Sequence, residues 1–573
     1  MSPIKGSVRR SQLITTYGIG ALIPIQDESF MIAGIERWPP AEPDLHEPRL
    51  ERQLGVTGFR LPPASENASD IPIVRFPRWY SCPKCRKLAN YRDLVGSFDQ
   101  NTCTRCNRVL VPSRFVVVCP KGHIEDFPYS RWVHEGKPSP SDDHDLYLEA
   151  RGRTASLSDI VVSCSCGAKR SMFGVFESGA FRGIASCQGR RPWLRESDSE
   201  CGTFIRALQR GASNVWFGVT PSAISIPPWS EGAFQLLNQY WTILKAIPES
   251  AIEETIETLG IANRDYSVED LVAAVRERKG LESGDSFEPA SDEEFRRQEF
   301  EALSKGNSES SGGQFVAHPE EVPAALGPWI DSVMLVTRLR EVRALSGFTR
   351  LYPYGGPVEV AALADPAPGW LPGIEVKGEG VFIRFAEDAV AGWEQRDSVV
   401  ERAASLDERF RARAEEWGRP VDRKITPRLL LAHTAAHALI NQLSLDAGYP
   451  VASLRERLYV FDDAVGILVY TASTDSAGSM GGLVTQGRSE NFEQMLVDAV
   501  ARSMWCSADP VCAEATPHGA DSLNLAACHA CALLPETSCE LQNSLLDRVL
   551  LIGTDHDPEC GFLRGIVSAP QPA

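Results

Sequence analysis

The sequence lacks the motifs that most ATP-driven and hydrolytic enzymes carry. It has no GxxxxGK[ST] phosphate loop, no HExxH zinc-binding helix, no GxSxG nucleophile elbow and no HxK pair of the phospholipase D kind. Each motif supplies a phosphate-binding loop, a general base or a nucleophile. The sequence therefore lacks the residues on which these reactions usually depend. The run Tyr17-Gly-Ile-Gly20 is only half of a dinucleotide-binding fingerprint, because its third glycine is missing.

Long apolar runs are absent too. No uncharged apolar stretch approaches the roughly 18 residues that span a bilayer. The first thirty residues have neither the apolar run nor the cleavage-like end of a secretory signal. We therefore expect a cytoplasmic protein.

The chain also lacks an overall excess of positive charge. It has 76 Asp and Glu against 58 Lys and Arg, a formal net charge of −18, which excludes a chain-wide surface for polyanions. Residues 82–210 depart from this trend, with 20 Lys and Arg against 14 Asp and Glu. Two interpretations fit equally: a local nucleic-acid-binding patch, or solvated arginines without a partner. The candidate nucleic-acid-binding residues are Arg105, Arg108, Arg114, Arg170, Arg182, Arg190, Arg191 and Arg195.

Cysteine, by contrast, is plentiful. Of the 15 cysteines, 14 fall within residues 82–201 or 506–539, and Cys560 stands alone. The reducing cytosol disfavours a disulfide framework of that size. We therefore interpret the two groups as ligands of structural Zn²⁺.

The first group predicts two zinc sites. Two CxxC pairs separated by 17 residues have the spacing of a zinc ribbon, with Cys82, Cys85, Cys103 and Cys106 as its ligands. The second site is expected to comprise Cys164, Cys166, Cys187 and Cys201. Cys119 and His123 have no cysteine pair near them in the sequence, so we favour a local structural role; metal binding is the alternative.

The second group predicts one further site around the CxxC pair Cys528 and Cys531. Cys512 upstream and Cys539 downstream complete it, with Cys506 as the competitor of Cys512. Closed four-thiolate sites contribute folding free energy and do not activate water. All three expected sites therefore predict a scaffold.

Changes in composition and periodicity predict a multidomain α+β chain. We expect a β-rich segment at 1–75 and a zinc-ribbon region with two cysteine clusters at 76–210. A mostly helical middle follows at 211–400, including an acidic linker at 281–323, where eleven acids face three bases. Much of this segment should be a mobile linker or an exposed acidic helix. A mixed α/β zinc-binding domain is expected at 401–573.

Within these regions some elements are well marked. The segment WIDSVMLVTRLREVRAL at 329–345 predicts a helix, and a charged helix is expected at 399–417. Another helix should begin after Thr426, a suitable cap, with Pro427 in its first turn, and end at Gly448.

His433 and His437 lie four apart on one face of that last helix. This is the spacing of zinc proteases, but Thr434 stands where their catalytic glutamate would follow. We favour structural histidines. The alternative is a metal-dependent nucleic-acid-processing enzyme that uses His433, His437 and an acid such as Asp475. We interpret the glycine-rich turn at 478–482 as a tight structural connection rather than a phosphate-binding loop.

Several segments resemble the DrmB family. They are the run RRSQLITTYG at 9–18, Trp38, the segments CPKC and CPKGHIEDFP, and the C-terminal segments YTASTDSAGSMGGLV and ACHACALLPETSCELQNSLLDR. The resemblance is densest at 7–40, 78–135 and 426–552. DrmB proteins are components of DISARM, a bacterial anti-phage defence system, and accompany the helicase DrmA.

The C-terminal part also resembles the four-cysteine zinc-binding domain at the C-termini of certain superfamily 2 helicases. Cys528, Cys531 and Cys539 match that motif, and Cys512 or Cys506 supplies the upstream ligand. The resemblance implies a non-catalytic, zinc-stabilised subunit that braces a DrmA-like helicase and helps it engage DNA. A stand-alone zinc-ribbon DNA-binding regulator is a further alternative.

Overall fold

The chain divides into two compact units, each assembled from separate stretches of sequence. Unit 1 comprises 1–45, 56–221 and 343–374, and unit 2 comprises 46–55, 222–342 and 375–573. The computed structural model describes residues 5–63, 70–97, 100–137, 144–150, 156–194, 201–283, 291–307, 313–353, 359–416, 420–421, 423–471, 481–517 and 523–568. As expected, the chain is a multidomain α+β protein.

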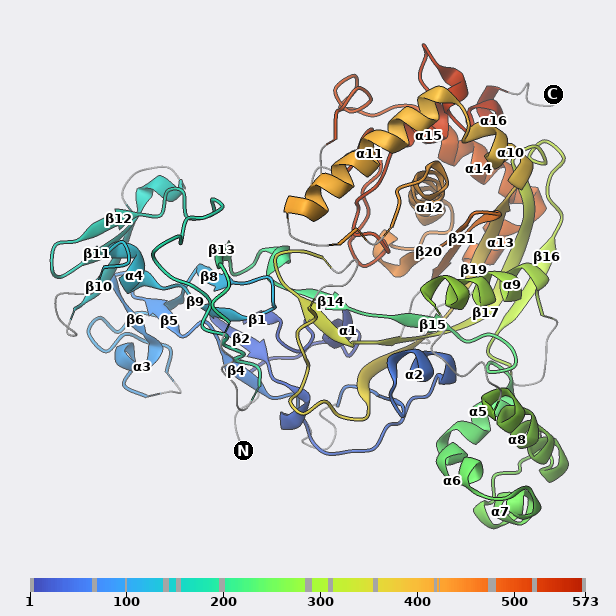
Figure 1. Ribbon diagram of the computed structural model, residues 1–573, viewed down its shortest axis with the longest axis horizontal. Coiled ribbons are helices and arrows are strands. Elements are labelled where there is room, and N and C mark those ends of the chain that lie inside the picture. The colour runs from blue at the N-terminus through green and yellow to red at the C-terminus, as the bar shows by residue number, and fades with distance from the viewer. Residues whose placement is uncertain are drawn as a thin grey trace. The chain divides into compact units, whose positions relative to one another are not determined.

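Unit 1 consists mainly of short strands in small sheets (Figure 1). Their orders are β1-β2-β4, β12-β11-β10-β6-β5-β7, β13-β8-β9 and β14-β18. The strands are β1 (Leu22–Ile25), β2 (Glu28–Ile32), β3 (Phe59–Arg60), β4 (Ile73–Arg75), β5 (Trp79–Ser81), β6 (Lys87–Asn90), β7 (Val111–Pro112), β8 (Phe115–Val118), β9 (Ile124–Asp126), β10 (Leu146–Ala150), β11 (Ile160–Cys164), β12 (Lys169–Ser171), β13 (Arg206–Gln209), β14 (Phe217–Val219) and β18 (Gly347–Thr349). The helices are α1 (Gln12–Thr15), α3 (Tyr91–Leu94) and α4 (Tyr129–Val133).

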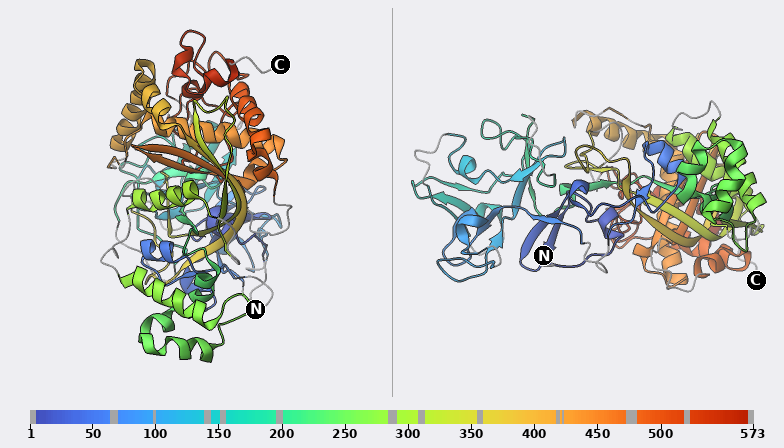
Figure 2. Two further views of the ribbon diagram at one scale, coloured as in Figure 1. Left: turned by 90° about the vertical axis from the view of Figure 1, so that its right-hand side faces the viewer. Right: turned by 90° about the horizontal axis from the view of Figure 1, so that it is seen from below.

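Unit 2 is organised around a sheet of order β15-β17-β19-β21-β20, with β16 paired to β17. Its strands are β15 (Ser222–Ile224), β16 (Val316–Glu320), β17 (Ile330–Ala344), β19 (Leu371–Phe385), β20 (Leu454–Phe461) and β21 (Ala464–Thr471). Its helices are α2 (Pro48–Leu54), α5 (Gly232–Leu237), α6 (Trp241–Ala246), α7 (Ile252–Leu259), α8 (Val268–Ser283), α9 (Asp292–Lys305), α10 (Glu387–Trp393), α11 (Asp397–Glu416), α12 (Pro427–Asp446), α13 (Gly482–Gly487), α14 (Ser489–Ser503), α15 (Arg548–Ile552) and α16 (Arg564–Ser568). Figure 2 shows α5 to α8, in green, gathered in one group, and they share an apolar core of their own.

Helix α12 is the centre of unit 2. It begins as the sequence predicts: the Thr426 hydroxyl accepts the backbone N–H of Leu429 at 3.3 Å, and Pro427 occupies the first turn. Its leucines and alanines are buried around nearly the whole circumference. Figure 1 shows α12 enclosed by α11, α14 and α15 and by strands β20 and β21. Because alanine side chains are small, neighbouring elements pack close to the helix axis.

One expectation about the middle of the chain is wrong. The predicted helix at 329–345 is the 15-residue strand β17, whose β-branched residues suit a sheet buried on both faces. The predicted acidic linker contains the packed helix α9 and the strand β16. Phe295, Phe300 and Glu299 of α9 are buried, so this segment is part of the core of unit 2.

No helix in the described ranges combines the length and the apolar character needed to cross a bilayer.

Candidate metal centres

Ligand-type side chains converge in five groups among the described residues. In each group, one Sγ, ring-nitrogen or carboxylate-oxygen atom from every residue lies within 4.8 Å of the others. The groups are site 1 (Cys82, Cys85, Cys103, Cys106), site 2 (Cys119, His123, Cys187, Cys201), site 3 (His134, His144, Cys164, Cys166), site 4 (Cys506, Cys512, Cys528, Cys531) and site 5 (His433, His437, Glu456, Cys539). All 15 cysteines are free thiols.

Site 1 unites the residues that the CxxC spacing grouped. Each CxxC pair forms a tight turn in which the fourth residue after the first cysteine donates its N–H to that cysteine's carbonyl: Arg86 to Cys82 at 2.9 Å, and Asn107 to Cys103 at 2.8 Å. Both donors have positive φ, 64° and 50°. Cys85 Sγ lies 3.9 Å from Cys103 Sγ, close to the roughly 3.8 Å edge of a zinc tetrahedron with Zn–S bonds of about 2.3 Å.

Burial raises the pKa of Cys82, but backbone N–H donors, first that of Cys85, outweigh burial and lower it to about 7. The thiolate form of Cys82, which metal binding would require, is therefore populated near neutral pH.

Site 2 overturns the expected second grouping. His123 Nδ1 lies 3.4 Å from Cys119 Sγ and 3.6 Å from Cys187 Sγ, and Cys201 completes the group. Thus Cys187 and Cys201 do not join Cys164 and Cys166, and the local structural role favoured for Cys119 and His123 gives way to a four-residue cluster.

Strand pairing explains the arrangement of site 2. β13 runs antiparallel to β8, with Arg206 opposite Val118, so the chain that carries Cys201 returns beside Cys119 at the end of β8. Hydrogen bonding from the Cys187 thiol, followed by that of His123, lowers the pKa of Cys119 to about 4 against the opposing effect of burial.

Site 3 completes the CxC pair with two histidines that the sequence analysis did not assign. His144 Nδ1 lies 3.2 Å from Cys164 Sγ, and His134 Nε2 lies 3.4 Å from Cys166 Sγ. Leu146 of β10 pairs with Cys164 of β11, which brings His144 to the cysteines. Two histidines within 32 residues upstream of a CxC pair were the available signal.

Site 4 decides the competition among the C-terminal cysteines. Cys506 Sγ lies 3.5 Å from Cys528 Sγ, and Cys531 Sγ lies 3.8 Å from the sulfurs of both Cys512 and Cys528. Cys506 and Cys512 therefore both belong to the site, and the inclusion of Cys539 is wrong. These distances are far longer than the roughly 2.05 Å of a disulfide and match a zinc tetrahedron.

Asp509 shapes the loop that carries the first two ligands of site 4. Its carboxylate accepts the backbone N–H groups of Cys506 at 2.9 Å and Ala513 at 3.1 Å, and it contacts Arg548. Burial raises the pKa of Cys512 to about 11, so metal binding there must displace a proton.

Site 5 lies between α12, β20 and the loop that follows Cys531. His433 Nε2 is 3.1 Å from Cys539 Sγ and 3.3 Å from Glu456 Oε1, and His437 Nε2 is 3.5 Å from Glu456 Oε2. All four residues are buried. The two histidines are therefore not isolated structural side chains. Asp475, the acid expected to act with them, and residues 478–480 of the glycine-rich turn lie outside the described residues.

The candidate nucleic-acid-binding arginines fall into two classes. Arg105, Arg108, Arg114, Arg182 and Arg190 are exposed, and Arg105 also lies 3.9 Å from the Asp145 carboxylate. Two others have structural partners: Arg170 stacks 3.6 Å from the ring centroid of Trp132, and Arg191 pairs with Asp365 at 3.2 Å. Arg195 lies outside the described residues.

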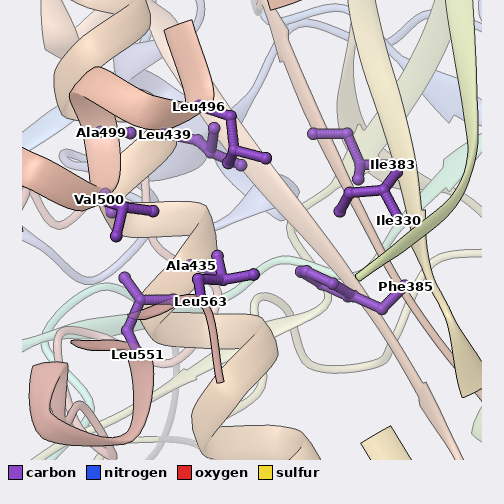
Figure 3. A pocket seen from close by; sticks show the side chains of 11 residues that line it. Ile330, Ile383, Phe385, Ala435, Leu439, Leu496, Ala499, Val500, Leu551 and Leu563 are labelled. Carbon is purple, nitrogen blue, oxygen red and sulfur yellow. The ribbon is translucent and has the colours of Figure 1, made fainter. Parts of the chain in front are cut away.

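A pocket in unit 2 has no capacity for acid–base chemistry. Figure 3 shows it between α12, α14, α15 and strands β17 and β19, lined by 11 side chains. They are Ile330, Ile383, Phe385, Ala435, Ala438, Leu439, Leu496, Ala499, Val500, Leu551 and Leu563. Because all of them are apolar, the pocket offers no titratable or nucleophilic group.

Comparisons with known proteins relate the chain to a zinc-binding domain and to a DISARM protein. A family model described as "Domain of unknown function (DUF8724)" matches residues 9–217, and the model of the "MrfA Zn-binding domain" matches residues 435–532. The second match contains every cysteine of site 4 but neither His433 nor Cys539 of site 5. The chain is 32% identical over 563 residues to the "DISARM protein DrmB" of Bacillus paralicheniformis. The aligned region covers 94% of this chain and 99% of that protein.

Proposed function

Because this chain belongs to the DrmB family of DISARM proteins, we propose that it is a non-catalytic, zinc-stabilised subunit of a bacterial anti-phage defence complex. In this proposal the chain binds a DrmA-like superfamily 2 helicase and helps it to engage DNA. The family relationship over nearly the whole chain carries the proposal, since it implies the same place in the same system.

The metal clusters support a scaffolding role. Sites 1 to 4 each present four cysteine or histidine ligands, and tetrahedral zinc with four protein ligands has no open position for substrate. Zinc held there contributes folding free energy. The donor sets fit zinc, because thiolate and imidazole are its preferred ligands and the Sγ–Sγ separations in sites 1 and 4 match its tetrahedron. We accordingly assign sites 1 to 4 as structural zinc sites.

Charge supports a contribution to DNA binding. Five of the eight candidate arginines are exposed, and they lie in the region that is net positive within a chain of charge −18. Since arginine pairs well with phosphate, exposed arginines of this kind would strengthen a complex on DNA without binding tightly alone.

Reconstitution with the helicase tests the proposal. We expect the chain to co-purify with a co-expressed DrmA-like helicase and to change that helicase's ATPase rate and DNA affinity. A failure to associate, together with unchanged ATPase rate and DNA affinity, would refute it. Strong, salt-dependent DNA binding by the isolated chain would instead favour the stand-alone regulator.

The enzymatic alternative is less well supported. His433 and His437 are both fully buried, and the third and fourth residues of their group are protein side chains, which leaves no position for substrate. Turnover of a nucleic acid by the helicase-free chain, lost on replacement of either histidine without loss of folding, would favour this alternative.

A further inference from the structure

The side chains of site 5 converge from three elements that are distant in the sequence. His433 and His437 come from α12, Glu456 from β20, and Cys539 from the loop before α15. The two imidazole rings are 4.5 Å apart and nearly perpendicular, at 85°. The separation of 106 residues between His433 and Cys539 means that only the folded unit brings these groups together.

Backbone hydrogen bonds fix the orientation of both imidazoles. Nδ1 of His433 faces the carbonyl of Leu545 at 3.2 Å, and Nδ1 of His437 faces the carbonyl of Ala532 at 2.8 Å. A carbonyl only accepts, so Nδ1 of each ring donates this hydrogen bond, and Nε2 of each ring faces the centre of the group. This arrangement, in which the outer nitrogen donates to a carbonyl, is typical of metal-binding histidines.

The atoms that face the centre of site 5 are of the kinds that bind cations: ring nitrogens, carboxylate oxygens and a sulfur. Cys539 Sγ accepts the N–H groups of Leu541 at 3.3 Å and Asn543 at 3.2 Å. Within the described residues, His437 Nε2 and Glu456 Oε2 are buried and, apart from their approach to each other at 3.5 Å, have no hydrogen-bond partner. Such buried polar atoms are costly unless something satisfies them. A cation at the centre would satisfy both of these atoms.

We propose that His433, His437, Glu456 and Cys539 hold a divalent metal ion in a closed site, separate from the four-cysteine site 4 of the same unit. The mixed set of two nitrogens, one oxygen and one sulfur fits Zn²⁺, which accepts all three donor types in tetrahedral geometry. Because four protein ligands fill the tetrahedron and all are buried, the ion is structural. It fastens α12 to β20 and to the loop before α15.

The proposal is independent of the helicase and of DNA. The unaltered full-length chain provides its direct test, through anomalous diffraction at the zinc edge. We expect a peak within bonding distance, about 2.0 to 2.3 Å, of the four ligand atoms of site 5. Peaks at sites 1 to 4 with none at site 5 would overturn it. A peak at site 5 that appears only at the absorption edge of another metal would confirm a metal site but refute its assignment to zinc.

A matched pair of variants tests the same inference by metal content. Glu456→Gln replaces an oxygen ligand with an amide that donates to an imidazole Nε2, so the group is satisfied without metal and the fold is retained. Glu379→Gln is the control, because Glu379 is also buried in the sheet but accepts hydrogen bonds from Leu483 N–H and the Tyr449 hydroxyl. Elemental analysis should find five metal ions per chain in the control, one for each of the five groups, and one fewer in Glu456→Gln. Equal metal content in the two variants would contradict the proposal, and the anomalous map decides the question should Glu456→Gln not fold.

Discussion

Replacement of Glu299 in α9 by glutamine should strongly destabilise unit 2. The Glu299 carboxylate accepts hydrogen bonds from Arg457 Nε at 2.6 Å and Nη2 at 2.7 Å, and from Ile224 N–H at 3.0 Å. Arg49 lies 3.6 Å away, and the side chains of Glu299 and Arg457 are almost completely buried. Glutamine would leave two buried guanidinium groups facing a neutral amide. Removal of one partner from a buried ion pair costs about 3 to 5 kcal/mol.

Hydrogen exchange of the full chain measures this loss in α9. At about 1.4 kcal/mol per tenfold change, we expect protection of the α9 amides to fall roughly 100- to 4,000-fold, provided that α9 opens with the surrounding sheet. Glu301→Gln on the same helix is the control, because Glu301 is exposed and surface substitutions change stability by about 0.5 kcal/mol or less. If the two variants showed equal α9 protection, the reasoning would be refuted.

Low pH should abolish the difference in stability between the wild-type chain and Glu299→Gln. Burial raises the pKa of Glu299, but Arg457 and then Arg49 lower it further, so the pKa lies below its ordinary 4.5. A lowered carboxylate pKa stabilises the fold above the unfolded-state pKa, and this stabilisation is lost as the pH falls through the folded-state pKa. The gap in thermal midpoint should therefore narrow as the pH falls below about 4.5. A constant gap would show that the charge of Glu299 is not the cause.

Further predictions concern the metal sites and the arginines. Cys187→Ser should remove the metal ion of site 2 and leave that of site 3, whereas His144→Ala should remove the ion of site 3 and leave that of site 2. Elemental analysis combined with anomalous diffraction checks both variants. Loss of the site 3 ion from Cys187→Ser would instead support the grouping expected from the sequence. Cys166 of site 3 is exposed, whereas site 5 is closed, so a chelator should remove metal from site 3 first; simultaneous release would contradict the difference in burial. Arg108→Glu with Arg182→Glu should weaken DNA binding of the helicase complex and reduce its salt dependence, as titrations at several salt concentrations would show; unchanged binding would indicate solvated arginines.

Local signals in the sequence predicted local structure well. Thr426 and Pro427 marked the start of α12 because capping is decided within one helical turn. The CxxC pairs of site 1 were predictable because each pair lies in a single turn. In contrast, β17 was mistaken for a helix. Arg340 of this strand is buried and bonded to Glu47 and Ser225, partners that only the tertiary structure supplies.

The groupings that failed all depend on long-range pairing. Cys119 meets Cys201 because β8 pairs with β13, and His433 meets Cys539 because the loop before α15 returns to α12. Cysteine spacing contains no information about such contacts. A histidine or glutamate ligand is also harder to recognise than a cysteine, because these residues have many other roles; Glu456 carried no signal at all.

Metal ions bound by ligands that are close or distant in the sequence would stabilise the fold to different extents. An ion that closes a longer loop removes more conformational freedom from the unfolded chain, although the gain grows only with the logarithm of loop length. Site 1 spans 25 residues from Cys82 to Cys106, whereas site 5 spans 107 from His433 to Cys539. Site 1 therefore stabilises one small region. An ion at site 5 would connect the central helix of unit 2 to the sheet and to the loop that follows site 4, so the four-cysteine site would rest on a fixed support. In a subunit that braces a helicase, this rigidity is the property that a structural metal can supply.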